Sequence, residues 1–165
     1  MRILGVDPAL RITGYGVIEV SGNRITLSGC GTIETDPEKP LEQRLLQIHR
    51  GLTQVLEKFR PRAMVLEKVF VHYRHTTTAF ALGQARGVIC LSCAEAAIPL
   101  VELAATQVKK AIVGRGHATK EQVQRMVART LCMRSLPRHM DTTDALALAI
   151  ALSHFIKVER TKGQV

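Results

Sequence analysis

The sequence predicts an α/β fold in which helices flank a mixed sheet of five strands. Two observations support this prediction. Apolar and β-branched residues follow the period of a strand through the first third of the chain, whereas segments with helical period dominate from residue 40 onward. Two further short apolar runs separate these helical segments. Three closely linked strands followed by helix, strand, helix, strand and helices are typical of helices packed around a mixed sheet.

The first third of the chain is expected to form an antiparallel meander of three strands. Residues 2–7 are a short apolar run that ends in an acid, residues 12–20 are rich in β-branched residues and glycine, and residues 23–35 alternate apolar with polar side chains. The links between them, PALR and SGN, consist largely of turn residues. Strands joined so closely usually pair with their neighbours in sequence.

A helix, a strand, a second helix and a fifth strand follow. Residues 40–60 place apolar side chains three and four positions apart, which is the period of an amphipathic helix. Residues 63–67 read as a short buried strand that again ends in an acid. Residues 76–97 are apolar on more than one side and contain two glycines four positions apart, which predicts a helix that another backbone can approach closely. Residues 98–103 predict the fifth strand, and a further helix runs through residue 113.

The last third of the chain is expected to be helical. Thr119 and Gln122 have the spacing of a capping box, so a helix begins there and ends near Leu131. The final helix begins at Asp141 and runs through residue 155. Cys90 and Cys93 form a C-x-x-C, but no second pair completes a zinc site, and we interpret the four cysteines as structural thiols in a reducing compartment.

Length and composition limit the class of protein. A chain of 165 residues can build one domain with a sizeable core but not two full-sized ones. We therefore expect a single domain over residues 1–156 and a frayed tail over residues 157–165. No apolar run reaches the ~20 residues of a membrane span, and the N-terminus lacks the apolar centre of a signal peptide. We expect a cytoplasmic protein without a membrane partner.

Four acids are candidates for a metal site. Asp7, Glu67, Asp141 and Asp144 all adjoin apolar runs, where an ionised carboxylate is costly unless it is paired or bound to a cation. Strand ends and a helix start can converge on one point, and carboxylates gathered there would repel one another without a counterion. Such oxygen-rich clusters suit Mg²⁺ or Mn²⁺. Two such ions, ~3.5–4 Å apart, can promote in-line attack of water on a phosphodiester.

Simpler interpretations of the same acids remain open at this point. Asp141 and Asp144 can cap a helix and favour its dipole. Asp7 can belong to a turn, and Glu67 can pair with a neighbouring base at the surface. Two other glutamates also lie among apolar residues, so position alone does not single out the four.

Basic residues are concentrated in one segment. The chain carries a net charge of +9, and residues 109–140 hold eight lysines and arginines against one glutamate, so this segment accounts for +7 of the total. A patch of this kind would follow a nucleic-acid backbone and make binding strongly dependent on salt. The alternative is an ordinary solvated helix face.

Four motifs together resemble the RuvC family of bacterial Holliday-junction resolvases. They occur in the family's order and with plausible spacing. The motifs are GVDPALRITGYGVI at 5–18, LEKVF at 66–70, LGQARGV at 82–88 and DTTDALALAIALSH at 141–154. The resemblance implies an RNase H-like fold, a homodimer and a Mg²⁺-dependent, structure-selective endonuclease that resolves four-way junctions in recombination and repair. It implies two ions per site, with Mn²⁺ as a substitute, and nicks with 5′-phosphate and 3′-hydroxyl ends.

The resemblance also implies roles for individual residues. The catalytic, metal-binding tetrad corresponds to Asp7, Glu67, Asp141 and Asp144. The family's C-terminal motif usually reads D-A-A-D, whereas here two threonines separate the acids. The DNA-contacting lysines correspond to Lys109 and Lys120. From its place at the centre of the predicted sheet, and not from the resemblance, Asp7 is expected to bridge both metals.

Three further expectations concern DNA and partners. Phe70 is expected to stack on unpaired bases of the junction, although without the resemblance a core position would be the better interpretation. The apolar helix at 76–97 is the candidate dimer interface, with packing on the sheet as its alternative. The RuvA–RuvB branch-migration complex is an implied partner. Competing functions are a non-catalytic junction-binding protein and the RNase H-like nucleases that process ribosomal RNA precursors.

Overall fold

A five-stranded mixed sheet forms the centre of the molecule. The computed structural model describes the backbone of residues 1–68 and 76–162 and the side chains of residues 1–68 and 79–157. The strands in this part are β1 (Arg2–Asp7), β2 (Ile12–Ser21), β3 (Arg24–Glu34), β4 (Ala63–Glu67) and β5 (Leu100–Leu103). They lie in the order β3-β2-β1-β4-β5, with β1, β2 and β3 antiparallel and β4 and β5 parallel to β1. The predicted meander and mixed sheet are confirmed.

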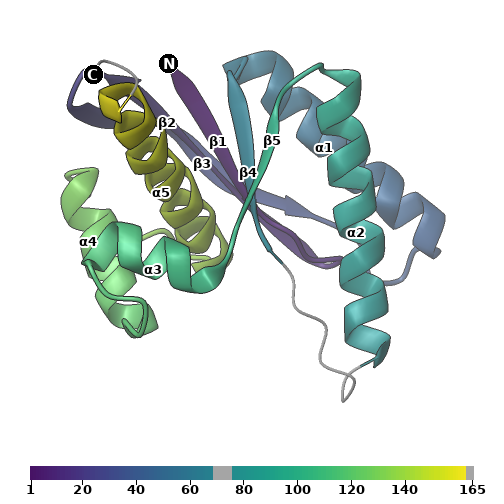
Figure 1. Cartoon of the computed structure of the whole chain (residues 1–165). Coiled ribbons are helices and arrows are strands. Elements are labelled where there is room, and N and C mark those ends of the chain that lie inside the picture. The colour runs from purple at the N-terminus through teal and green to yellow at the C-terminus, as the bar shows by residue number, and fades with distance from the viewer. Residues whose placement is uncertain (69–75, 163–165) are drawn as a thin grey trace.

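Helices cover both faces of the sheet. Those described are α1 (Leu41–Phe59), α2 (Thr76–Glu95), α3 (Ala105–Val113), α4 (Lys120–Thr130) and α5 (Met140–Lys162). Helices α1 and α2 pack together on one side, and α3, α4 and α5 lie on the other (Figure 1). None of the described helices is long and apolar enough to cross a membrane.

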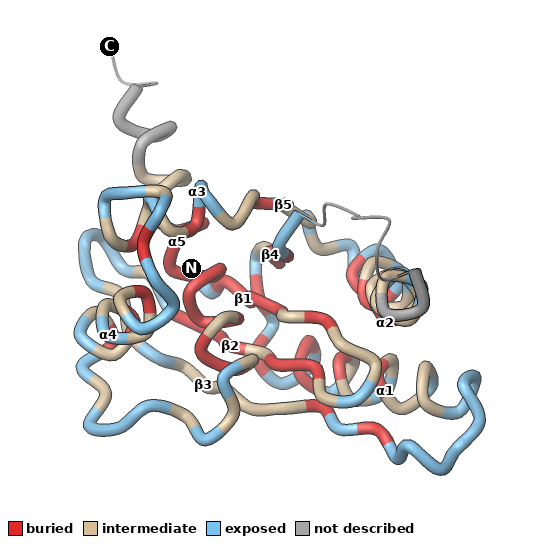
Figure 2. The backbone as a smooth tube through the Cα atoms, turned by 90° about the horizontal axis from the view of Figure 1, so that it is seen from below, coloured by how far each residue is buried: buried red, intermediate tan, exposed pale blue. Residues whose placement is uncertain are grey.

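Two cores result from this layering, one on each face of the sheet. Side chains alternate along β1, so that Ile3 joins the core beneath α5 whereas Leu4 joins the core beneath α1 and α2, and both are fully buried. A strand buried on both faces must be apolar at successive positions, which is why β1 and β4 read as short continuous apolar runs. Figure 2 shows the buried stretches of β1, β2 and α5 in red near the centre, with most exposed residues around them.

Helix α5 lies unusually close to β1 and β2. A Cβ atom on Gly5 would come 1.9 Å from the carbonyl oxygen of Ala145, and one on Gly14 would come 2.3 Å from that of Asp141. Only glycine fits at such close approaches of two backbones. Because Gly14 pairs with Asp7 across β1 and β2, this contact sets the first turn of α5 beside the end of β1.

Element boundaries confirm most of the helical predictions and correct one. Thr119 caps α4 as expected: its side chain accepts a hydrogen bond from the Gln122 backbone N–H, and the Thr119 N–H donates to the side-chain oxygen Oε1 of Gln122. The final helix, expected to end at residue 155, continues to Lys162, while the frayed tail over residues 157–165 stays a prediction. The prediction ended the helix where apolar residues become sparse. However, no glycine or proline stops the helix before Gly163.

Candidate active site

Three elements bring acidic side chains to one end of the sheet. Strands β1 and β4 are parallel neighbours that end at Asp7 and Glu67, respectively. Helix α5 begins at Met140 and places Asp141 in its first turn and Asp144 one turn further on. The close contact at Gly14 fixes this turn against the strand ends. The sequence therefore places the acids at a common edge although they are far apart along the chain.

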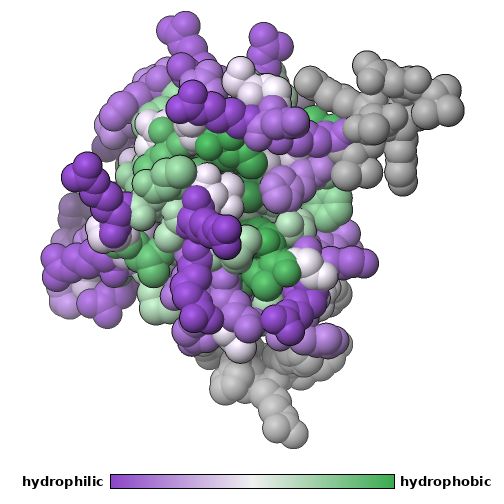
Figure 3. Space-filling model, turned by 90° about the vertical axis from the view of Figure 1, so that its left-hand side faces the viewer, coloured by the Kyte–Doolittle hydropathy of each residue, from purple (hydrophilic) through white to green (hydrophobic). Residues whose placement is uncertain are grey.

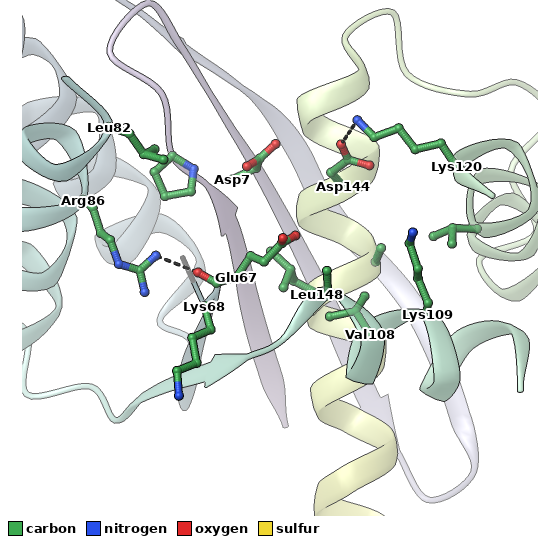
Figure 4. A pocket seen from close by; sticks show the side chains of 14 residues that line it. Asp7, Glu67, Lys68, Leu82, Arg86, Val108, Lys109, Lys120, Asp144 and Leu148 are labelled. Carbon is green, nitrogen blue, oxygen red and sulfur yellow. Dashed lines mark hydrogen bonds and ion pairs between the residues drawn. The ribbon is translucent and has the colours of Figure 1, made fainter. Parts of the chain in front are cut away.

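A cavity of about 490 Å³ opens at this edge. Helix α2 forms one wall, α3 and α4 form the other, and the strand ends and α5 lie between them (Figure 4). The charged side chains that line it are Asp7, Glu67, Lys68, Arg86, Lys109, Lys120 and Asp144. Acids from the strand ends and from α5 thus face bases from the surrounding helices across a space open to solvent.

Asp7 has the most perturbed environment among the described carboxylates. Its pKa is raised from 3.8 to about 7, first because burial removes water from the carboxyl and then because Asp144, Asp141 and Glu67 repel its charge. The Lys120 ammonium opposes this rise only in part. Burial and repulsion therefore oppose ionisation of this carboxyl, and a further positive charge would favour it.

The neighbouring acids share this electrostatic environment. Glu67 lies exposed at the rim, yet the pKa of its carboxyl is raised by loss of water and by Asp144, against the lowering effect of Lys120 and Lys109. The ammonium of Lys120 lies 2.9 Å from Oδ2 of Asp144, and this contact raises the pKa of Lys120. Lys120 therefore pairs directly with one acid, and its charge also lowers the pKa of Asp7 and Glu67.

Most of the predicted site residues line the cavity. Asp7, Glu67, Asp144, Lys109 and Lys120 meet at the cavity. Asp141 does not line it, but its charge acts on Asp7. Phe70 lies outside the described residues.

Two features of the site escaped the sequence reading. Arg86 lines the cavity and contacts β4, although the LGQARGV motif that contains it had been singled out. An arginine inside an otherwise apolar helical segment is the signal in the sequence that could have found it. The hydroxyl of Thr142, one of the two threonines between the C-terminal acids, donates to the Gly31 carbonyl at 3.2 Å and joins α5 to β3.

The chemistry of the donor set fits a divalent cation. In the described part of the chain, no three histidine, cysteine or acidic side chains lie close enough to ligate one ion as they stand. Neighbouring acids nevertheless raise the pKa of the Asp7 and Glu67 carboxyls, and the ammonium of Lys120 pairs with Asp144. Carboxylate oxygens are the ligands that Mg²⁺ and Mn²⁺ prefer, and a cation would relieve the repulsion among them.

The basic segment forms an exposed surface beside the cavity. Of its eight lysines and arginines, Lys109 is half-buried and the other seven are exposed. Figure 3 views the face on the α4 side, where hydrophilic side chains project around a smaller apolar area. Lys109 and Lys120 line the cavity itself, so the positive surface continues into the acidic site. This arrangement suits a polyanion that passes over the carboxylates.

Comparison with known proteins identifies the family. The model of the family described as crossover junction endodeoxyribonuclease RuvC matches residues 3–154. The chain belongs to the RuvC family. The RuvC of Nitrobacter hamburgensis is 47% identical over 93% of this chain and 89% of its own length. The RuvC of Geobacter sulfurreducens is 46% identical over 91% of this chain and 90% of its own.

Solved RuvC structures share the fold throughout. Thermus thermophilus RuvC in complex with a Holliday junction substrate has a TM-score of 0.91 and 34% identity, covering 96% of each chain. The yeast mitochondrial Holliday junction resolvase Ydc2 has a TM-score of 0.62 at 11% identity, over 93% of this chain and 79% of its own, and shows likeness of fold alone. The expected RNase H-like fold of this RuvC-family chain is confirmed.

Proposed function

We propose that this RuvC-family protein is a Holliday-junction resolvase that cuts four-way DNA junctions by paired, metal-dependent hydrolysis in recombination and repair. The observation that supports this most directly is the raised pKa of Asp7 among three other acids, inside a cavity flanked by lysines. An acidic cluster that needs a cation, next to a surface that attracts phosphates, has the two parts of a metal-dependent nuclease. The products proposed are nicks with 5′-phosphate and 3′-hydroxyl ends.

Mg²⁺ is the proposed cofactor, with two ions per site and Mn²⁺ as a substitute. Asp7, Glu67, Asp141 and Asp144 would hold the ions, since the charges of the other three acids all act on Asp7. When bound, the metal supplies an activated water and stabilises the leaving 3′ oxygen. The four acids contribute the negative charge that retains the ions at the sheet edge.

Lysines at the cavity wall would position the DNA. Lys109 and Lys120 project into the cavity from α3 and α4, the two helices that carry much of the exposed basic surface. They are placed to contact phosphates next to the bond that is cut, while the remaining bases follow the backbone further away. In the protein alone, Lys120 pairs with Asp144. When metal and DNA bind, Asp144 would contact the metal instead and Lys120 would contact a phosphate. Phe70 is proposed to stack on bases at the junction.

A homodimer through α2 would match the symmetry of the substrate. Phe80, Gly83, Gly87, Leu91 and Ala94 form an exposed stripe along this helix, and Phe80 and Leu91 are 72% and 56% exposed. Added Cβ atoms at either glycine would meet no atom within 4 Å, so a second backbone could approach closely there. A two-fold dimer would present two identical sites to a junction that itself has approximate two-fold symmetry.

The setting of the reaction follows from the same proposal. A protein that resolves junctions in bacterial DNA would act in the cytoplasm. The RuvA–RuvB branch-migration complex is its proposed partner. The non-catalytic alternative would retain the basic surface but would have no use for the acidic cavity. The ribosomal RNA-processing alternative loses support because the RuvC family model spans residues 3–154.

The test of the function compares wild type with Asp7→Asn on a synthetic four-way junction in Mg²⁺. Wild type should cut the junction in preference to linear duplex and to RNA. The variant should lose at least ~10³-fold in cleavage rate, because a metal-binding carboxylate becomes a neutral amide, while still binding the junction. Asp36→Asn, which makes the same change in an exposed turn, is the matched control and should cut normally.

Two results would overturn this proposal. Undiminished cleavage by Asp7→Asn would remove Asp7 from the catalytic site. Tight binding by wild type without cleavage in any divalent metal, together with no metal binding in calorimetry, would favour the architectural alternative.

A further inference from the structure

Arg86 connects α2 to the acidic end of the sheet. One of its terminal nitrogens, Nη1, donates to the backbone carbonyl of Glu67 at 2.8 Å, and the other, Nη2, forms an ion pair with the carboxylate of Glu102 on β5. The Arg86 side chain is only 14% exposed. A single side chain therefore contacts the last residue of β4 and its neighbouring strand from a helix on one face of the sheet.

The carbonyl that Arg86 binds lies where strand pairing ends. Strands β1 and β4 pair from Ile3 and Ala63 to Val6 and Leu66, so Glu67 is beyond the last β1 partner. On the other side, the Lys68 N–H donates to the Leu103 carbonyl at 2.8 Å. Arg86 thus supplies a donor to Glu67 at the point where its strand leaves the sheet and where a free carbonyl would otherwise depend on water.

The Arg86 guanidinium contacts the backbone of Glu67 and not its carboxylate. Figure 4 shows the Glu67 carboxylate directed towards Asp7 and Asp144, while Arg86 contacts the backbone on the other side. The cations that lower the pKa of the Glu67 carboxyl are Lys120 and Lys109. The Arg86 charge is instead paired with Glu102, so Arg86 holds the residue without serving as the counterion of its carboxylate.

We propose that Arg86 is a positioning residue that fixes the Glu67 carboxylate for metal binding and couples this acid to α2. The inference rests on the proposed function, because it gives Arg86 its role through a metal-binding Glu67. Arg86 adjoins Gly87 of the exposed stripe that we propose as the dimer surface. Pairing of two α2 helices would therefore steady the helix that holds Glu67 in place, so that the acid is best ordered in the assembled dimer.

The test replaces Arg86 and measures metal binding together with cleavage. Arg86→Gln should lower Mn²⁺ affinity in calorimetry by about 10- to 100-fold, the usual range for a residue that orients a ligand. It should raise the Mg²⁺ concentration for half-maximal junction cleavage by a similar factor, while junction affinity in the absence of metal stays within about twofold. Arg86→Lys keeps the charge but not the two-pronged geometry, and should recover only part of the loss.

Matched variants distinguish positioning from general damage to the fold. Arg50→Gln makes the same change at an exposed position of α1 and should leave metal affinity and cleavage unchanged. Glu102→Gln should have a weaker effect than Arg86→Gln, because Glu102 is 46% exposed and the backbone contact survives. In a protein that already carries Glu67→Gln, Arg86→Gln should cause no further loss of metal affinity, because Arg86 acts only through the Glu67 carboxylate.

The outcomes separate this inference from the proposed function. Unchanged metal affinity and metal dependence in a folded Arg86→Gln variant would overturn the positioning role while wild-type cleavage stands. Equal losses in the wild-type and Glu67→Gln backgrounds would also overturn it. If wild type cuts no junctions, the proposed function fails, and the Mn²⁺ affinity of the Arg86 variants still decides whether Arg86 positions Glu67.

Discussion

The carboxyl of Asp7 ionises in an environment that opposes its charge. Its pKa is about 7 in the folded protein against 3.8 without the fold, so the folded state binds more protons between these values. Stability contributed by this group is therefore fully present below about pH 4 and declines as the pH rises towards 7. The same repulsion that weakens the protein alone favours binding of a cation, so the site gives up stability in exchange for metal affinity.

Asp7→Asn should accordingly stabilise the metal-free protein at pH 8, because the amide never ionises. The gain should be at most about 4 kcal/mol, from the size of the pKa shift, and should shrink as the pH falls towards 4. Urea unfolding in a chelator at several pH values measures it. Added Mn²⁺ should stabilise wild type more than the variant. If the variant were less stable than wild type by the same amount at every pH, ionisation of the Asp7 carboxyl would not be destabilising the protein.

At the scale of elements, the contact of α5 with β2 sets the site. Gly14→Ala would place a Cβ 2.3 Å from the Asp141 backbone, and α5 would have to move away from the strand that pairs with Asp7. We expect a loss of about 1–3 kcal/mol in the free energy of unfolding, together with a fall in cleavage larger than the loss of folded protein explains. Chemical denaturation and cleavage rates at a temperature where the variant is folded measure the two effects.

Gly116→Ala is the matched control for this prediction. An added Cβ there would have its nearest neighbour at 3.4 Å, so the change should leave both stability and cleavage close to wild type. If Gly14→Ala behaved like Gly116→Ala, close packing of α5 would not be what positions the acids.

A second prediction at this scale concerns the exposed stripe of α2. Leu91→Arg places a charge in the proposed dimer surface and should shift the protein from dimer to monomer in sedimentation at micromolar concentration. Leu46→Arg, at a residue of α1 that is 43% exposed, is the matched control and should leave the mass unchanged. Monomeric wild type, or a dimer that Leu91→Arg leaves intact, would contradict α2 as the interface.

Periodicity predicted the elements well because the sheet buries both faces of its central strands. Runs such as residues 3–6 and 63–66 can be free of polar side chains only in a sheet covered on both sides, and each is followed by an acid that marks the functional edge. Position in the sequence could not show that α5 begins beside β1, since this depends on the long-range contact at Gly14. The contact of Arg86 with a carbonyl was equally invisible, because any backbone carbonyl reads the same in a sequence.

At the scale of the whole molecule, the net charge of +9 sums two opposed parts. The segment 109–140 contributes +7 and lies on and around α3 and α4, while the acids gather in the cavity between those helices and α2. A junction has two strands to cut, and one cavity in each chain can cut one. Two-fold pairing would set the number and symmetry of the cuts, beyond what one chain can achieve.

Mixed dimers therefore provide the test at this scale. Dimers with one wild-type and one Asp7→Asn subunit, isolated by two different affinity tags, should nick a junction in one strand and leave it unresolved. Wild-type dimers carrying the same tags should give two symmetric nicks and linear products. The mixed dimer should bind the junction as tightly as wild type, because both basic surfaces are intact. Resolution at the wild-type rate by the mixed dimer would show that one site can make both cuts, and the dimer would then serve binding alone.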